Sequence, residues 1–131
     1  MRYLTIGEVF TMHDRAIWEY GGSPELLNLG RLEATLAAPR QTMFGEELYP
    51  DVLSKAVILF YLLIKNHPFL DGNKRTAFLA LMRFLNINGY ALNATNDELY
   101  QFTIDVASSI LTKEEVEIWI RDKAIKMSYE K

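Results

Sequence analysis

The chain has 131 residues, of which 50% are hydrophobic, a formal net charge of −3 and no cysteine. These values predict one globular domain over residues 1–131, with a core that buries roughly two-thirds of the unfolded surface. They argue against direct nucleic-acid binding, which needs a basic surface, and they exclude disulfides and thiolate metal sites.

No segment of the sequence has the pattern of an export signal or a membrane span. The first residues lack the apolar core of a signal peptide. The longest apolar run, Ala56 to Ile64, is far shorter than the ~20 residues that a membrane span needs. We therefore expect a cytoplasmic protein with no membrane partner, and the absence of cysteine is in keeping with a reducing compartment.

Capping residues and helical periodicity predict two helices in the first part of the chain. Thr5 and Glu8 match a capping box, so the first helix is expected to begin there and to run to about Tyr20. Ser-Pro at residues 23–24 has the pattern of a cap followed by an N1 proline, which predicts a short helical turn. A second helix is predicted over residues 30–38, closed by the proline that follows.

Two strongly apolar helices are predicted after a loop at residues 41–50. The first spans residues 51–66 and is apolar on all sides from residue 57 to 64, which is typical of a central helix. The second spans residues 74–88 and is almost as apolar. We expect the two to pack as a hairpin pair at the core, with the segment between them as their connection.

Two further helices are predicted in the last third of the chain. Thr95 or Asn96 caps one that runs to about Ser108. Thr112, with a glutamate three residues on, forms a capping box for a last helix that reaches about Met127.

No clear strand is predicted, and Tyr-Ala-Leu at residues 90–92 is at most a short extended piece. The patterns together predict an all-α fold, a compact bundle of six or seven helices.

The connection between the two central helices concentrates charged and polar groups. It reads His-Pro-Phe-Leu-Asp-Gly-Asn-Lys-Arg over residues 67–75. Asn73 is a preferred N-cap for the second central helix, which puts Lys74 and Arg75 in its first turn. Cations there oppose the helix dipole by roughly 0.3–1 kcal/mol each. Two such cations beside free backbone N–H groups suit an anion, most commonly a phosphate.

Three other residues of the connection have chemical or anchoring interpretations. Asp71 is suited to hold a magnesium ion that bridges phosphate oxygens. His67 follows the first central helix, which Pro68 cannot continue, and its imidazole can take a proton from an attacking hydroxyl. Phe69 is interpreted as an apolar anchor that fixes the loop to the core.

Each of these residues also has a purely structural interpretation. The Asp-Gly pair is a common turn dipeptide, and Asn73 can be only a cap. The two cations after it can be only solvated charges, and His67 only a helix-end residue. A purely structural loop has no need for all of them in this order, so the combination favours a functional site.

The connection resembles the signature of the Fic/Doc superfamily, His-x-Phe-x-Asp/Glu-Gly-Asn-Gly/Lys-Arg, and more closely that of its Doc (death-on-curing) toxin branch. Weaker similarity extends from Tyr3 through the Tyr-Gly-Gly at Tyr20 to the Asn-Gly-Tyr at Asn88 and covers most of the chain. The resemblance implies a Fic/Doc-type bundle with the motif loop between two central helices. The chain fits every position of the signature: His67, Phe69, Asp71, Gly72, Asn73, Lys74 and Arg75.

The resemblance also implies a reaction. A Doc-like toxin transfers a phosphoryl group from ATP, with Mg²⁺, to a threonine or serine hydroxyl of a protein, and the known Doc target is translation elongation factor Tu. His67 is then the base and Asp71 the metal ligand. The phosphates and the nucleotide are bound by the rest of the motif, namely Gly72, Asn73, Lys74 and Arg75.

Lys74 decides between two reactions within the superfamily. Nucleotide-transferring Fic enzymes usually have glycine at this position, which leaves room for the α- and β-phosphates. Doc-like proteins have lysine, and in the family interpretation ATP then binds reversed, with its γ-phosphate at the reactive point. Gly72 is nearer the broader Fic pattern, since Doc-type loops also carry alanine there. Transfer of AMP to a protein hydroxyl is therefore the alternative function.

The resemblance implies a partner as well. Many Fic proteins carry an inhibitory helix with the pattern Ser/Thr-x-x-x-Glu-Gly/Asn. The nearest match here runs from Thr42 to Glu46 but is followed by Glu47 and lies in a loop, so we expect a separate, Phd-like antitoxin instead. In Fic-like folds the loop that matches residues 41–50 lies beside the active site and helps to dock the target segment.

Two other classes of function are less well supported. His13-Asp14 is the one adjacent His-Asp pair, as in HD-type metal phosphohydrolases, but no histidine precedes it. His13 is interpreted instead as part of the inner face of the first helix, with the apolar side chains around it. A non-catalytic binding module that kept the scaffold is the remaining alternative, and the intact motif argues against it.

Overall fold

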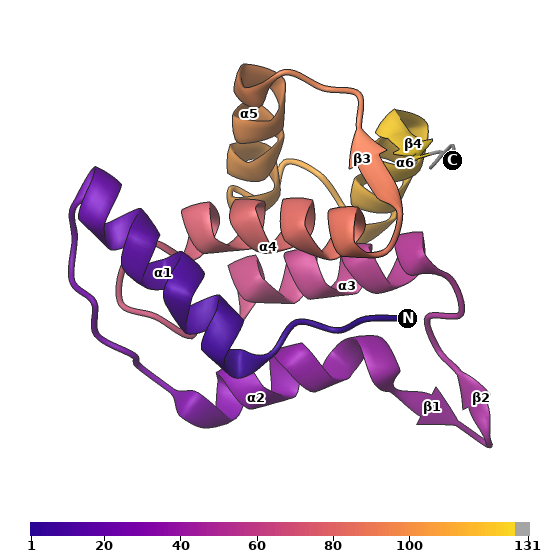
Figure 1. The fold of residues 1–131 in the computed structure, drawn as a ribbon, viewed down its shortest axis with the longest axis horizontal. Coiled ribbons are helices and arrows are strands. Elements are labelled where there is room, and N and C mark those ends of the chain that lie inside the picture. The colour runs from indigo at the N-terminus through magenta and orange to yellow at the C-terminus, as the bar shows by residue number, and fades with distance from the viewer. Residues whose placement is uncertain (128–131) are drawn as a thin grey trace, which may run out of the picture.

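The computed structural model describes residues 1–127, and helices dominate this part of the chain (Figure 1). No helix within it has both the length and the apolar character that a membrane crossing requires. The elements are α1 (Ile6–Tyr20), α2 (Leu29–Ala37), the 3-10 helix η1 (Ala38–Arg40), β1 (Thr42–Met43), β2 (Glu46–Glu47), α3 (Val52–Lys65), α4 (Asn73–Ile87), β3 (Tyr90–Leu92), α5 (Asn96–Ala107), α6 (Lys113–Lys123) and β4 (Ala124–Lys126).

The predicted all-α architecture is confirmed, and α3 and α4 form its centre. The two helices lie side by side, with α1 and α2 on one side of the pair and α5 and α6 on the other (Figure 1). Phe60 of α3 is fully buried, as are Ala77 and Leu81 of α4. Burial of whole apolar side chains contributes about 1.5–3 kcal/mol each, so this pair carries much of the stability.

Local side-chain caps begin most of the helices. The predicted capping boxes of Thr5 and Thr112 are both present, and Thr95 forms a third with Glu98. Asp51 caps α3 by accepting a hydrogen bond from the Ser54 N–H at 2.9 Å. Each such cap is worth about 1 kcal/mol, which explains why short-range sequence patterns located these helix starts.

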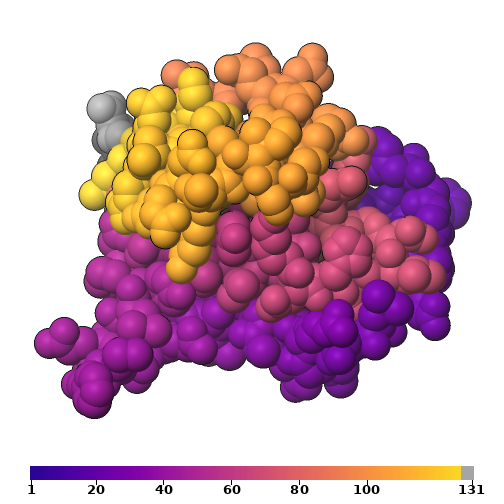
Figure 2. All heavy atoms as spheres, turned by 180° about the vertical axis from the view of Figure 1, so that it is seen from behind, coloured from indigo at the N-terminus to yellow at the C-terminus, as the bar shows by residue number. Residues whose placement is uncertain are grey.

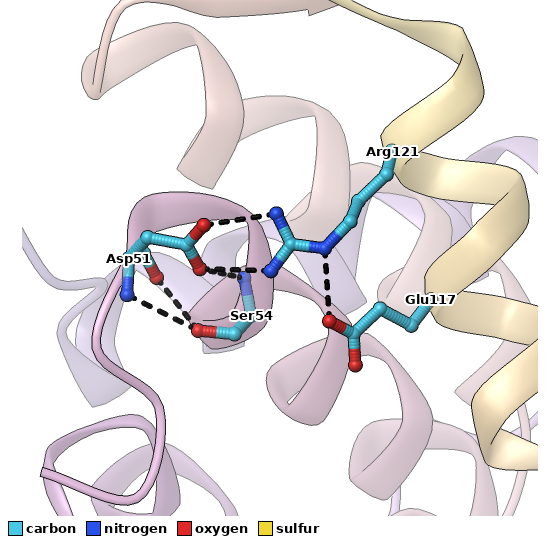
Figure 3. Close-up of polar contacts among 4 residues, drawn as sticks. All are labelled: Asp51, Ser54, Glu117 and Arg121. Atoms are coloured by element: carbon cyan, nitrogen blue, oxygen red, sulfur yellow. Dashed lines mark hydrogen bonds and ion pairs between the residues drawn. The ribbon is translucent and has the colours of Figure 1, made fainter.

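Asp51 also links α3 to α6 (Figure 3). Its carboxylate accepts two hydrogen bonds from the Arg121 guanidinium, at 2.9 and 3.0 Å. Arg121 in turn donates from Nε to Glu117 at 2.9 Å. The hydrogen bonds from Arg121, and those from Ser54, hold the pKa of Asp51 well below its usual range. The last helix is thereby fixed to the start of the central helix.

Residues 1–127 form four short strands in two pairs, of which the sequence patterns indicated only β3, as a short extended piece. β1 pairs antiparallel with β2, and β3 pairs antiparallel with β4, with Tyr90 opposite Lys126. The last helix therefore ends at Lys123 instead of continuing to about Met127. Strands of two or three residues are too short to show a period in the sequence, and the partner strands 90–92 and 124–126 are far apart along the chain.

One local prediction near α2 was wrong. No helical turn begins at residues 23–24, and Leu26 forms an isolated β-bridge with Phe69. The predicted helix over residues 30–38 is present as α2 and ends at Ala37, before Pro39. Pro39 itself lies in the first turn of η1, the 3-10 helix that follows α2. Proline is tolerated in the first turn of a helix because the N–H it lacks has no partner there.

The loop at residues 41–50 contains the β1–β2 hairpin, and it does not lie beside the motif loop. The hairpin precedes α3, whereas the motif follows α3, so the length of the helix separates them (Figure 1). The hairpin projects as a separate lobe at the lower left of Figure 2, and Phe44 at its turn is 99% exposed. The expectation that this loop adjoins the candidate site is therefore wrong.

Candidate functional site

The motif loop, residues 67–72, joins α3 to α4 in a tight path with two left-handed residues. His67 has a φ of 49° and Gly72 a φ of 80°. The loop is held on its outer side by the segment after α1, because the N–H groups of Leu27 and Asn28 both donate to the carbonyl oxygen of Pro68. The N–H of Leu70 donates to the Glu25 carbonyl oxygen at 3.0 Å. These backbone bonds give the loop a defined shape.

Asn73 closes the motif loop from within and is not the N-cap of α4. Its Oδ1 accepts a hydrogen bond from the Phe69 N–H at 3.0 Å, and its Nδ2 donates to the Phe69 carbonyl oxygen at 2.8 Å. The side chain is only 5% exposed, and Gly72 occupies the cap position. The N–H and the carbonyl oxygen of Phe69 are buried, so only a protein group such as the Asn73 amide can bond them. These two bonds outweigh a helix cap, because water can bond the N–H groups at an exposed helix start. What Asn73 can offer to an anion is its backbone N–H.

Phe69 and His13 connect the motif loop to α1. Phe69 is 1% exposed and its ring stacks on that of His13, with centroids 3.7 Å apart. The Nε2 of His13 lies 2.7 Å from the carbonyl oxygen of Asp71. A carbonyl oxygen only accepts, so Nε2 carries the proton in this contact. The interpretation of His13 as a packing residue of the first helix missed this hydrogen bond.

Gly72 lies so close to α1 that no larger residue fits without displacement. A Cβ atom built on it would lie 3.2 Å from the Cδ1 of Ile17 and 3.4 Å from the His13 ring. Its backbone φ of 80° is also one that residues with a Cβ atom rarely adopt. Gly72 therefore sets how closely the start of α4 approaches α1.

A cleft of about 580 Å³ opens over the motif loop and brings the predicted side chains together. His67 and Asp71 reach it from the loop, and Lys74 and Arg75 from the first turn of α4. Phe69 does not line it. The other walls come from the end of α1 and the end of α5, whose residues the sequence patterns did not assign to the site: Tyr20, Gly21, Gly22, Ala107 and Ser108.

Asp71 is positioned by the segment that follows α1. Its Oδ2 accepts a hydrogen bond from the Ser23 N–H at 2.8 Å, which leaves Oδ1 for another partner. A Cβ on Gly22 would lie 3.0 Å from the Cβ of Asp71, so the close approach requires glycine. The double glycine in the sequence was the signal for this approach, although its partner was not evident from the sequence.

The carboxylate of Asp71 fits a magnesium ion that is bound together with phosphate. Among residues 1–127, no three His, Asp or Glu side chains come together as a ready-made metal site. Mg²⁺ is commonly bound by one or two carboxylates, with phosphate oxygens and water as its remaining ligands. Asp71, an exposed carboxylate in a cleft that Lys74 and Arg75 also line, is in keeping with that mode.

The cationic side of the cleft is the start of α4. The first N–H groups of a helix have no partner within the helix, and the positive end of the dipole lies there. Lys74 is exposed, whereas Arg75 is half-buried. The guanidinium carbon of Arg75 lies 3.7 Å from the ring centre of Tyr20 and 4.3 Å from that of Tyr100. The arrangement can bind an anionic ligand close to a possible base, His67.

Comparisons with known proteins agree with the motif. The model of the Fic/DOC family matches residues 3–85, which include the whole motif loop. Toxin Doc of Mycolicibacterium smegmatis is 37% identical over 94 residues, or 72% of this chain and 68% of that protein. Protein kinase doc of Escherichia phage P1 is 31% identical over 108 residues, or 82% of this chain and 84% of that protein.

Proposed function

Because this chain belongs to the Fic/DOC family, we propose that it is a Doc-like toxin of a toxin–antitoxin module that phosphorylates a protein hydroxyl with ATP. The observation that supports this most directly is the cleft itself. It combines an exposed imidazole, an exposed carboxylate and the cationic start of α4. Phosphoryl transfer depends mainly on positioning and charge neutralisation, and these groups are suited to both.

In the proposed reaction, the hydroxyl oxygen of a threonine or serine forms a bond to the γ-phosphorus of ATP. The bond from that phosphorus to the β–γ bridging oxygen breaks, and ADP leaves. His67 accepts the hydroxyl proton, for which its exposure at the rim of the cleft is suitable. Lys74, Arg75 and the backbone N–H groups from Gly72 to Asn73 bind the phosphates.

A magnesium ion held by Asp71 would neutralise phosphate charge during the transfer. The side chains of Asn73 and Phe69 do not contact the substrate in this scheme. The hydrogen bonds between them keep the motif loop in the conformation that presents His67 and Asp71 to the same cleft.

Two partners follow from the proposal. The protein substrate is translation elongation factor Tu, whose modification would halt translation. The second partner is a Phd-like antitoxin that blocks the toxin, and its disordered tail would fold as a helix on this protein. Residues 42–46, the nearest match to the inhibitory pattern, are in the exposed β1–β2 hairpin and not in a helix near the cleft. This location argues against inhibition by the chain itself and supports a separate inhibitor.

The test uses ATP labelled at either the γ- or the α-phosphate. The purified protein, Mg²⁺ and elongation factor Tu are mixed with each form, and the label on the factor is measured. Label from the γ-position alone supports phosphorylation, and a matching mass increase of one phosphate identifies the product. Label from the α-position instead indicates AMP transfer. This is the alternative function, which is kept because Gly72 is nearer the broader Fic pattern than the Doc pattern. No label on elongation factor Tu or on any protein of a cell extract would contradict both enzymatic functions.

A further inference from the structure

Two tyrosines from different helices face the guanidinium of Arg75. Tyr20 is the last residue of α1 and Tyr100 lies in the middle of α5. The guanidinium carbon is 3.7 Å from the centre of the Tyr20 ring and 4.3 Å from the centre of the Tyr100 ring. A cation over an aromatic face is attracted by the ring quadrupole, and arginine also stacks on such faces. The two rings therefore define where the guanidinium lies.

Arg75 makes no hydrogen bond and no ion pair with other side chains or carbonyl groups of residues 1–127. Its charge is half-buried at the wall of the cleft, and its contacts are aromatic faces. Stacking fixes a guanidinium without using its N–H donors, which a carboxylate partner would occupy. The arrangement holds the cation in place and keeps its donors for a ligand.

The two tyrosines differ in their relation to the cleft. Tyr20 lines it, so a ligand can contact Tyr20 directly. Tyr100 does not line it, and what it contacts at the site is Arg75. An effect of Tyr100 on ligand binding must therefore pass through Arg75.

We propose that Tyr100 is a positioning residue for Arg75, and that the two rings prearrange the guanidinium for the phosphates of a nucleotide. The ligand class rests on the function proposed above, whereas the positioning of Arg75 does not. A free arginine side chain loses rotamer freedom when a ligand orders it, and this loss weakens binding. A guanidinium that the protein has already ordered avoids that loss.

The binding test compares Tyr100→Leu, which removes the aromatic face, with Tyr100→Phe, which keeps it. The dissociation constant of Mg-ATP is measured by calorimetry. We expect Tyr100→Leu to weaken binding roughly three- to tenfold and Tyr100→Phe to leave it unchanged. In the Arg75→Ala background, Tyr100→Leu should have no further effect, because the contact through which it acts is gone. Tyr100→Gln replaces Tyr100→Leu if thermal unfolding shows that the leucine variant does not fold.

A second measurement tests the positioning without any ligand. The ¹⁵N heteronuclear NOE of the Arg75 Nε–H group, assigned by its loss in Arg75→Lys, reports how ordered the guanidinium is. It should fall in Tyr100→Leu and stay high in Tyr100→Phe. Equal NOE values in all three proteins would overturn the positioning role. If the wild type binds no Mg-ATP while the NOE still depends on Tyr100, the proposed function fails and the positioning stands.

Discussion

The imidazole ring of His13 lies flat on the phenyl ring of Phe69, with the ring centres 3.7 Å apart and an angle of 9° between the planes. The same imidazole contacts the carbonyl oxygen of Asp71 through Nε2 at 2.7 Å. One buried side chain of α1 thus contacts two residues of the motif loop. Replacing His13 should therefore affect both the stability of the fold and the shape of the site.

We expect His13→Ala to lower the free energy of unfolding by about 2–4 kcal/mol, since it removes a buried ring and the hydrogen bond to the partly buried carbonyl oxygen of Asp71. His13→Phe keeps the stack but not the hydrogen bond and should cost less. Urea unfolding measures both. The neighbouring Asp14→Ala is the control, because Asp14 is exposed and should change stability by less than about 0.5 kcal/mol. A loss for His13→Ala no larger than for this control would contradict the role of His13.

Gly72→Ala should destabilise the protein by about 2–4 kcal/mol, because backbone strain and tight contacts with Ile17 and His13 add together. Gly45→Ala separates the two contributions. Gly45 has nearly the same φ, 81°, but a Cβ there would meet no atom within 4 Å. Gly45→Ala should lower the free energy of unfolding only by the cost of the backbone strain, about 1–2 kcal/mol. The difference between the two variants in thermal or urea unfolding measures the close approach of α4 to α1, and equal losses would contradict it.

His67→Ala should reduce the transfer rate by about 10²–10⁴-fold, which is the usual contribution of a general base. The fold should be unaffected, because His67 is exposed and outside the helices. Single-turnover kinetics with labelled ATP measures the rate, and thermal unfolding measures the stability. A variant that transfers label as fast as the wild type would remove His67 from the role of base.

The Asp51–Arg121 contact predicts a dependence of stability on pH. The pKa of Asp51 is lowered in the folded protein, chiefly by the hydrogen bonds from Arg121, so its ionised form stabilises the fold. This contribution is fully present above the unfolded pKa, about 3.9, and is lost as the pH falls below that value toward the folded pKa. The Asp51 side chain is 52% exposed, so solvent screening limits the contribution to about 1 kcal/mol.

Asp51→Asn is the matched variant for this contact, because asparagine is an equally good N-cap but carries no charge. At pH 7 it should be less stable than the wild type by about 1 kcal/mol, and near pH 2 the difference should shrink. Urea unfolding at the two pH values measures this. A difference that is constant from pH 7 to pH 2 would show that the charge of Asp51 does not contribute.

Lys55 anchors the β1–β2 hairpin from within the core. It is 1% exposed, and its Nζ donates to the Pro39 carbonyl oxygen and to Glu47, both at 2.9 Å. Lys55→Met keeps the apolar stem but removes both bonds, which should cost about 1–3 kcal/mol. Hydrogen exchange of the Leu48 N–H, which bonds to the Gln41 carbonyl oxygen, should accelerate. ATP binding should not change, because the cleft lies over the motif loop. That loop follows the end of α3 opposite to the hairpin (Figure 1). Unchanged exchange at Leu48 would contradict the anchoring.

The features that the sequence predicted correctly depend on neighbours along the chain. The boxes at Thr5 and Thr112 locate two helix starts because the bonded partners are three residues apart. The apolar run in α3 places that helix at the centre, since no side of it is suited to water. The motif at residues 67–75 is likewise local, and its nine residues are enough to indicate the family.

The features that only the tertiary structure decided depend on pairs that are distant in sequence. Asn73 turns inward because the Phe69 backbone needs a partner once the loop is buried, and a cap preference gives no sign of this. His13 meets Asp71, and Tyr20 and Tyr100 meet Arg75, only because α1 and α5 pack against the start of α4. Side-chain preferences act over one or two turns of a helix, whereas the positions of whole helices follow from how all the apolar faces fit together.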